Sequence, residues 1–281
     1  MWVSLGPIIV INCIFFASIF YYYYTGSTKV HGSEQAARRS KSVFLSYFFK
    51  EWWLWLNEPI TKWLIRRGFT PNLITFAGFV MSVVAGVFFA LGQFGWGGWM
   101  MVLGATLDYF DGRVARLTDK ETRSGAFFDS VMDRFGEAVC FMGLAWYFRE
   151  SWILAFVIAA LIGSTMVSYT RARGQAVGVD CKKGSMQRPE RIVYMGVSSI
   201  FQAIATLLIW PFYATTYPFL VVLAILFMGV MTNATACFRM VDIMNTLDHE
   251  DKRGGGSSIP QMLVKLTTPE GREELKEKVG L

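Results

Sequence analysis

The sequence predicts an all-α membrane protein with seven transmembrane helices and one amphipathic helix that lies in the membrane interface. Hydrophobic residues make up 53% of the 281 residues and charged residues only 17%, with a mean hydropathy of +0.38. Apolar runs recur along the chain, and several approach the ~20 residues that a helix needs to cross a bilayer. Basic residues gather at alternate ends of these runs, as in membrane proteins. A soluble one- or two-domain protein is therefore excluded.

Seven apolar runs are assigned as membrane spans. They are Trp2–Tyr24, Leu73–Leu91, Trp96–Phe110, Ala126–Phe148, Trp152–Tyr169, Ile192–Phe212 and Phe219–Phe238. The first run has neither a basic start nor a small-residue cleavage site. We therefore expect a retained helix there rather than a signal peptide that is removed.

A polar linker, Gly26–Lys41, separates the first span from a predicted amphipathic helix over Leu45–Trp63. Its pattern gives an apolar face opposite a polar one, which favours a helix lying in the membrane interface. The apolar face holds Leu45, Phe49, Trp52, Leu56 and Trp63, and the polar face holds Lys50, Asn57 and Thr61. Thr70-Pro71-Asn72 then forms a typical helix start for the second span.

After the last span, Leu247–Ser258 is charged and glycine-rich, which predicts a flexible linker. Thr268-Pro269-Glu270 predicts the start of a short helix that runs to Lys278. The chain is accordingly divided into an N-terminal transmembrane helix with its linker (1–40), an interfacial helix (41–70), a membrane domain (71–245) and a flexible tail (246–281).

The net charge of +6 indicates orientation rather than a nucleic-acid partner. If Met1 lies outside, all of the Lys and Arg residues that flank the spans lie inside except Arg149. The positive-inside rule therefore places the C-terminal tail and the third-to-fourth connection in the cytoplasm.

Cysteine and histidine chemistry is not indicated. Cys13, Cys140, Cys181 and Cys237 lie far apart, with neither metal-ligand spacing nor a disulfide framework. His31 and His249 both lie in polar connecting segments, so the sequence suggests no zinc site.

Four aspartates stand out around the third-to-fourth connection. Asp108 and Asp111 are three residues apart, and Asp129 and Asp133 are four apart, so each pair shares one helix face. Carboxylates near a membrane are costly unless cations neutralise them. A set of oxygen ligands without His or Cys favours Mg²⁺ or Mn²⁺. Divalent ions among arginines indicate a phosphate-bearing substrate.

The aspartates form the pattern D-x-x-D-G-x-x-A-R-x8-G-x3-D-x3-D. Its fixed positions are Asp108, Asp111, Gly112, Ala115, Arg116, Gly125, Asp129 and Asp133. At every one of them the chain resembles the CDP-alcohol phosphatidyltransferases, over roughly Pro71 to Arg239. The resemblance implies a six-helix transmembrane core bundle, to which this chain adds one extra N-terminal transmembrane helix. It also implies a homodimer, and we expect a bacterial inner-membrane protein.

The resemblance implies that a phosphatidyl group moves from CDP-diacylglycerol to a small alcohol with release of CMP. It assigns two divalent ions, Mg²⁺ or Mn²⁺, to Asp108, Asp111 and Asp129, with Asp133 able to reach the metal and acting as general base. The nucleotide-binding residues that we predict are Asn72, Thr75, Gly112, Ala115, Arg116 and Gly125.

The acceptor alcohol is predicted from arginines that close three spans on the cytoplasmic side. They are Arg171, Arg188, Arg191 and Arg239. An arginine cluster beside a metal site suits a phosphorylated acceptor. Together with D-S-V-M-D-R at 129–134, this arrangement resembles the phosphatidylinositol-phosphate synthases, which implies inositol phosphate. The D-P-x-A-D-K version typical of phosphatidylglycerol-phosphate synthases is absent.

Other functions remain open at this point. Within the same reaction, glycerol phosphate, serine or another polyol phosphate could be the acceptor. A divalent-cation transporter would use the carboxylates as an ion path, but the arginines and motif glycines argue against it. A catalytically silent lipid-binding or scaffold protein is the third class, although all four aspartates are intact.

Overall fold

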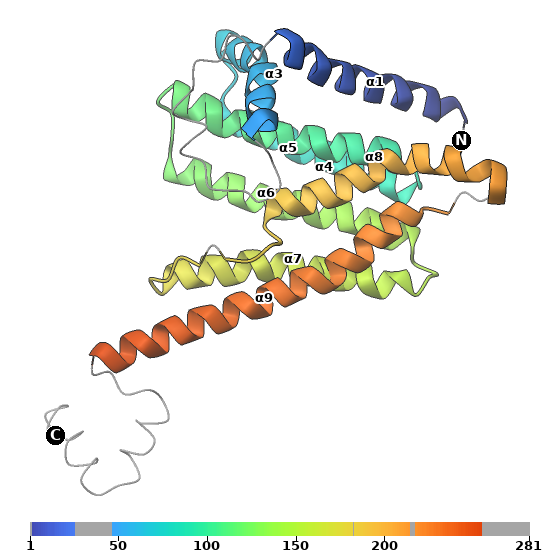
Figure 1. Cartoon of the computed structure of the whole chain (residues 1–281). Helices are drawn as coiled ribbons and strands as arrows, with labels where there is room; N and C mark the ends of the chain where they lie inside the picture. Colours follow the sequence, from blue (N-terminus) through green and yellow to red (C-terminus); the bar gives the residue numbers. More distant parts are fainter. Residues whose placement is uncertain (1, 26–46, 182, 214–216, 255–281) are drawn as a thin grey trace, which may run out of the picture. The chain divides into compact units, whose positions relative to one another are not determined.

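The computed structural model describes residues 2–25, 47–181, 183–213 and 217–254 (Figure 1). Within these ranges the chain is helical and has no strand, which confirms the predicted all-α class. The helices are α1 (Trp2–Thr25), α3 (Tyr47–Arg66), α4 (Pro71–Ala90), α5 (Phe94–Leu117), α6 (Arg123–Tyr147), α7 (Ile153–Ala176), α8 (Arg188–Tyr213) and α9 (Phe219–Gly254). The predicted linker Gly26–Lys41 and the predicted tail helix from Thr268 lie outside the described residues.

The chain divides into two compact units. The first comprises residues 1–158 and 189–227, and therefore holds α1, α3, α4, α5, α6 and α8. The second comprises residues 159–188 and 228–281, and its helices are most of α7 and the later part of α9.

Membrane-spanning character is clear from several helices. By length and composition, α4, α7 and residues 219–249 of α9 can each cross a membrane. Helices α5, α6 and α8 have 24, 25 and 26 residues and are long enough, but each carries charged side chains. Helix α1 has 24 residues. The protein is therefore an integral membrane protein whose charged helices carry its polar chemistry.

Helix α4 is held against both α5 and α6 by glycines, and the three helices lie side by side in Figure 1. A Cβ atom added to Gly78 of α4 would lie 3.2 Å from the carbonyl oxygen of Gly104 in α5. A Cβ atom added to Gly143 of α6 would lie only 2.0 Å from the carbonyl oxygen of Gly86 in α4. Small residues let helices in membranes approach this closely. Helices α5 and α6, which carry the aspartates, are thereby fixed around one helix.

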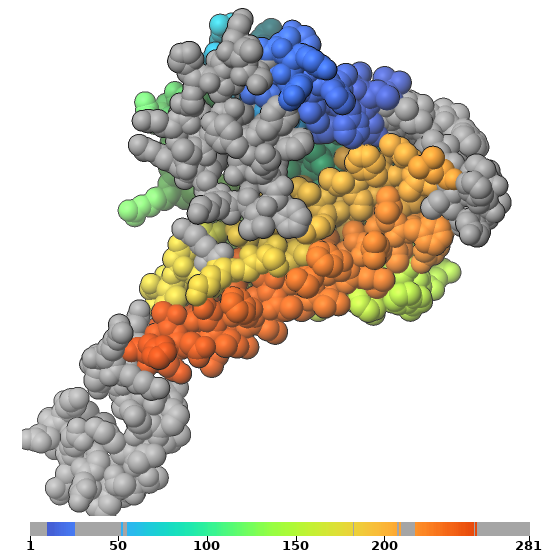
Figure 2. Space-filling model, in the orientation of Figure 1, coloured from blue at the N-terminus to red at the C-terminus, as the bar shows by residue number. Residues whose placement is uncertain are grey.

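Over its described side chains, residues 10–25, the N-terminal helix α1 packs on other helices of the first unit through one side. Ile11 and Phe15 lie against a core formed by Trp99 of α5 and by Ile200 and Ala203 of α8. The opposite side is apolar and exposed, and Figure 2 shows α1 (blue) at the molecular surface. Its exposed side chains include Ile14, Phe20 and Tyr24. This is the arrangement expected of an added helix that faces lipid on its outer side.

Helix α3 is present as predicted, but its faces differ from the prediction. Asn57 and Thr61, assigned to the exposed polar face, are buried, whereas Trp63 is half exposed. The Thr61 hydroxyl donates to the carbonyl oxygen of Asn57, which satisfies it within the helix. Trp52, which lies on the predicted apolar face, is buried against protein and packs on Phe15 of α1. The alternation of polar and apolar residues cannot distinguish a face that packs on protein from one that meets lipid headgroups.

In the second unit, α7 and α9 are in direct contact. A Cβ atom added to Gly163 of α7 would lie 2.1 Å from the hydroxyl of Thr232, and the Asn233 amide donates to the carbonyl oxygen of Ala159 at 2.8 Å. Helix α9 continues to Gly254. The flexible linker predicted from Leu247 is therefore wrong for residues 247–254, because the charged residues there extend the helix and do not end it.

Candidate active site

Asp111 is held in place by hydrogen bonds from two neutral donors. It lies in α5, where Phe110 and Val114 form a buried core with Leu64 of α3 and Ile74 of α4. The side chain of Asp111 is buried, and the Thr75 hydroxyl of α4 donates to its Oδ2 at 2.5 Å. The backbone amide of Gly112 donates to its Oδ1. These contacts fix the orientation of the carboxylate.

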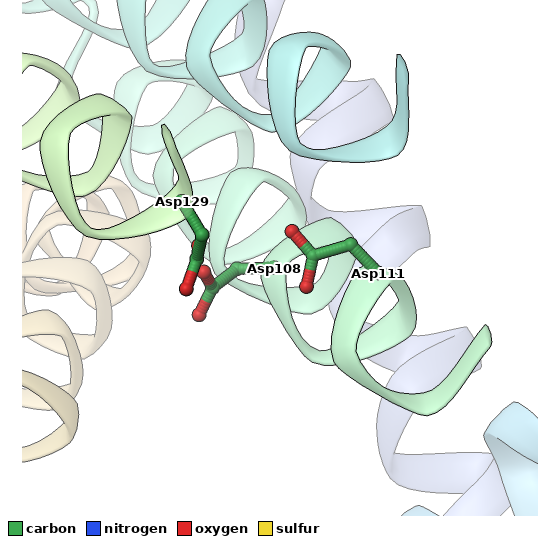
Figure 3. A group of neighbouring side chains, drawn as sticks. All are labelled: Asp108, Asp111 and Asp129. Atoms are coloured by element: carbon green, nitrogen blue, oxygen red, sulfur yellow. The ribbon is translucent and has the colours of Figure 1, made fainter. Parts of the chain in front are cut away.

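Three carboxylates meet between α5 and α6. One oxygen each from Asp108, Asp111 and Asp129 lies within 4.8 Å of the others, and Figure 3 shows the carboxylates turned toward one another. Oxygens bound to one Mg²⁺ at about 2.1 Å lie at most about 4.2 Å apart. A small inward shift would therefore bring all three onto one ion. Their donor set, made only of oxygen, fits a hard divalent cation such as Mg²⁺ or Mn²⁺.

Asp133 lies one turn further along α6 than Asp129, and is half-buried. It is not among the three clustered carboxylates. The start of α6 is defined by Thr122, whose side chain accepts a hydrogen bond from the amide of Gly125 at 3.0 Å. This cap fixes where α6 begins, ahead of the face that carries Asp129 and Asp133. The roles predicted for Asp133 as metal ligand and general base stay predictions.

The residues predicted to bind the nucleotide lie near the motif glycines. A Cβ atom added to Gly112 would lie 3.3 Å from a guanidinium nitrogen of Arg116, which is exposed in the last turn of α5. A Cβ atom added to Gly125 would lie 3.3 Å from the amide oxygen of Asn72. Ala115 is half-buried on α5. The two glycines therefore make room for neighbouring polar side chains at both ends of the motif.

Arg191 has a partner that sequence reasoning missed. It is 1% exposed in α8, and its Nε and Nη2 donate to the two carboxylate oxygens of Glu137 in α6 at 2.6 and 2.8 Å. Glu137 lies four residues after Asp133, so Asp129, Asp133 and Glu137 follow one stripe of α6. That spacing is visible in the sequence. The pairing of Glu137 with Arg191, 54 residues away, is not visible there.

The other predicted acceptor arginines have their own contacts. Arg239 is 2% exposed and donates to the carbonyl oxygens of Lys183 and Val167, and Arg171 lies 3.9 Å from Asp180. A hydrogen bond to Asp242 raises the pKa of Lys183, which keeps this side chain charged. Arg171, Arg188 and Arg239 belong to the second unit and Arg191 to the first. Their meeting at a single phosphate therefore stays a prediction.

The family of the chain follows from its sequence over the same helices. The sequence model of the CDP-alcohol phosphatidyltransferases matches residues 69–241, which span α4 to α8 and most of α9. The chain belongs to this family. It is therefore a membrane-bound transferase of phospholipid synthesis, and the aspartate cluster lies inside the matched region.

Individual members agree with this assignment. The chain is 34% identical over 151 residues to a phosphatidylinositol phosphate synthase of Mycobacteroides abscessus, covering 52% of this chain and 69% of that protein. It is 37% identical over 148 residues to an archaetidylinositol phosphate synthase of Pyrococcus horikoshii, covering 52% and 78% respectively.

Solved structures give the same picture. The phosphatidylinositol phosphate synthase of Mycobacterium tuberculosis with CDP-DAG bound aligns with a TM-score of 0.57 at 26% identity, over 66% of this chain and 92% of that one. The same enzyme in complex with manganese and citrate aligns with a TM-score of 0.58 at 25% identity, over 66% and 88%. The extra helix α1 lies outside the family match, which begins at residue 69.

Proposed function

We propose that this enzyme transfers the phosphatidyl group of CDP-diacylglycerol to inositol phosphate and releases CMP. The observation that carries the proposal is the cluster of Asp108, Asp111 and Asp129 within 4.8 Å, inside a region that matches the CDP-alcohol phosphatidyltransferases. The choice of acceptor is supported by relatives that are named for making phosphatidylinositol phosphate or archaetidylinositol phosphate.

For the donor, we assign the diphosphate of CDP-diacylglycerol to the end of α5 and the start of α6. Two divalent ions, Mg²⁺ or Mn²⁺, held by Asp108, Asp111 and Asp129, would bind the diphosphate and stabilise the departing oxygen of CMP. Arg116 offers a fork of donors to the same phosphates. The nucleotide would lie along Asn72, Gly112, Ala115 and Gly125, with Thr75 acting through Asp111 rather than by direct contact.

For the acceptor, we assign Asp133 as the base that takes the proton from the attacking hydroxyl. Arg191 meets α6 at Glu137, four residues and therefore about 6 Å along the helix from Asp133. An acceptor whose hydroxyl faces Asp133 and whose phosphate faces Arg191 would span about one helical turn.

The remaining arginines are assigned to the same acceptor. Arg171 near the end of α7, Arg188 at the start of α8 and Arg239 in the middle of α9 offer charged donors, and we propose that they bind the phosphate together with Arg191. Arg239 already bonds two carbonyl oxygens, so its role also includes holding the connection that contains Lys183.

The reaction is tested by measuring CMP release from CDP-diacylglycerol with purified protein and Mg²⁺ or Mn²⁺. The acceptors to compare are inositol phosphate, inositol, glycerol phosphate and serine. We expect turnover with inositol phosphate to exceed that with every other alcohol. Equal or faster turnover with unphosphorylated alcohols would rule out the phosphate-acceptor assignment and leave the transfer reaction itself intact. Absence of CMP release with all of them would favour a transporter or a lipid-binding protein.

We further propose that the protein lies in a bacterial inner membrane with its active site facing the cytoplasm, and that it forms a homodimer. Cys181 is buried and its thiol lies 3.3 Å from Asp242, so it is a poor labelling target. Lys183 is two-thirds exposed and Arg149 about half exposed. In a cysteine-free chain, an impermeant thiol reagent should label Arg149→Cys in intact cells, and Lys183→Cys only after permeabilisation. The mass of the purified complex tests the dimer.

A further inference from the structure

Helix α6 carries a charged side chain on its exposed apolar side. Arg134 is exposed and lies eleven residues after Arg123, the first residue of the helix. It therefore stands about 16 Å along the helix from that end. Phe127, Phe135 and Met142 are exposed on the same side of α6. In a membrane, an arginine at this place on a lipid-facing side is costly unless an anion matches its charge.

The guanidinium of Arg134 is directed back along α6, toward the end of the helix where the aspartates lie. Its Nη1 donates to the backbone carbonyl oxygen and to the hydroxyl of Ser130, one turn earlier. Ser130 directly follows Asp129, and Arg134 directly follows Asp133. Since successive residues of a helix are turned by about 100°, Ser130 and Arg134 lie between the face of the aspartates and the apolar side.

The charge of Arg134 contrasts with that of Arg149, which follows the far end of α6. Arg149 donates to the carbonyl oxygen of Trp146 at 3.1 Å, and its guanidinium lies 5.0 Å from the centroid of that ring. It also pairs with Glu150 at 3.4 Å. Arg134 makes the same kind of bond to a carbonyl oxygen one turn back, but within the described part of the chain it forms no ion pair.

We propose that Arg134 and Ser130 bind the headgroup of an anionic phospholipid, at a site separate from that of CDP-diacylglycerol. A guanidinium offers a fork of N–H donors that matches two phosphate oxygens. The acyl chains would lie along the exposed apolar side, on Phe135 and Met142. Phosphatidylglycerol, with one negative charge, should bind better than phosphatidylcholine, whose own ammonium group offsets the phosphate.

The experiment measures binding of phosphatidylglycerol and of phosphatidylcholine to the purified full chain in detergent, by native mass spectrometry without either substrate. The result therefore does not depend on the proposed reaction. We expect Arg134→Gln to lower the affinity for phosphatidylglycerol roughly 10-fold and to remove the preference over phosphatidylcholine. Added phosphatidylglycerol should raise the melting temperature of the wild type more than that of the variant.

Arg149→Gln is the matched control, because Arg149 bonds a carbonyl oxygen in the same way but has a carboxylate partner. It should change the affinity for phosphatidylglycerol by less than about twofold. Arg134→Lys keeps the charge without the fork, should bind with intermediate affinity, and guards against a glutamine variant that fails to fold. Equal losses in Arg134→Gln and Arg149→Gln, or wild-type affinity in Arg134→Gln, would overturn the proposal.

Competition separates this lipid from the two other molecules that could occupy the same side of α6. Binding of phosphatidylglycerol should persist when CDP-diacylglycerol and Mn²⁺ are saturating. If CDP-diacylglycerol displaces it, Arg134 belongs to the donor site and the proposal is wrong. A wild-type protein that carries no phosphatidylglycerol, and whose mass is that of a dimer, would assign this side to a second copy of the chain and would also refute the lipid site.

Discussion

The carboxylates between α5 and α6 gather charges of the same sign, whereas the buried arginines of α8 and α9 contact negatively charged or carbonyl oxygens. Asp108, Asp111 and Asp129 bring three like charges within 4.8 Å, and the hydrogen bonds described for Asp111 come from neutral donors. Arg191 is matched by a carboxylate, and Arg239 by two backbone carbonyl oxygens. The described contacts of the arginines are thus to negatively charged or carbonyl oxygens, whereas the three carboxylates gather like charges, which suits a cation.

This difference indicates what each region requires. Like charges at close range disfavour one another, so a bound cation would stabilise the acidic region. Removing a protein partner from a buried arginine leaves a costly uncompensated charge, so the stability of each arginine site depends on the protein groups that contact the arginine. We therefore expect added metal to determine the stability of the acidic cluster. Mutation of neighbouring residues should determine the stability of the arginine sites.

The largest effect should come from removing a clustered carboxylate. Asp108→Ala or Asp111→Ala should lower kcat/KM by about 10³-fold or more, because metal stabilisation of the reacting phosphates is worth several kcal/mol. Added Mn²⁺ should raise the melting temperature of the wild type and leave that of either variant unchanged. If a variant still responds to Mn²⁺, the cluster is not the metal site, and the comparison with the arginines fails.

The next effect separates Asp133 from the cluster. Asp133→Asn should lower kcat by roughly 10²–10⁴-fold, the range expected when a general base is lost. The shift in melting temperature with Mn²⁺ and the binding of CDP-diacylglycerol should persist, because Asp133 is not among the three clustered residues. Near-normal turnover of the Asn variant would remove the base role. Loss of the Mn²⁺ response would instead make Asp133 a metal ligand.

The variants of the two arginines should then differ in whether a second substitution can recover their lost stability. Arg191→Ala and Arg239→Ala should each raise the acceptor KM roughly 10- to 100-fold, since a charge-assisted bond contributes about 1.5–3 kcal/mol. Arg191→Ala leaves Glu137 buried without its arginine, so adding Glu137→Gln should recover part of the lost melting temperature. No side-chain substitution can do the same for Arg239, whose described partners are backbone atoms. Unchanged acceptor KM in both single variants would contradict the phosphate site.

The sequence predicts the helical class, the spans and the aspartate motif because each depends on local patterns. Apolar runs and the spacing of Asp108 to Asp133 are properties of neighbouring residues, and the structure brings three of these four carboxylates together. The extra helix α1 was likewise visible from its composition alone.

The contacts that position these residues could not be predicted in the same way. The Thr75–Asp111 and Glu137–Arg191 bonds join residues 36 and 54 positions apart. Only the close packing of α4, α5, α6 and α8 brings such residues together. The buried side of α3 was missed because Asn57 and Thr61 are polar yet buried, with Thr61 bonded inside its own helix. A periodic pattern reveals that two faces differ, but not what each face touches.

The smallest effect should come from Thr75, whose hydroxyl connects α4 to the acidic region. Thr75→Val keeps the branched shape and removes the hydrogen bond that the hydroxyl donates to Asp111 at 2.5 Å. Loss of a group that orients a metal ligand typically costs 10- to 100-fold in metal affinity, and we expect roughly 10-fold because Gly112 still donates to Asp111. The activity of the variant should therefore recover at saturating Mn²⁺.

Thr75→Ser is the matched control, because it restores the hydroxyl and should restore the metal affinity. Asn72→Ala provides the contrast, since Asn72 is assigned to the nucleotide. That variant should raise the KM for CDP-diacylglycerol at every Mn²⁺ concentration. If Thr75→Val behaves like Asn72→Ala and excess Mn²⁺ does not rescue it, Thr75 binds the nucleotide directly. Its hydrogen bond to Asp111 would then be incidental to the metal site.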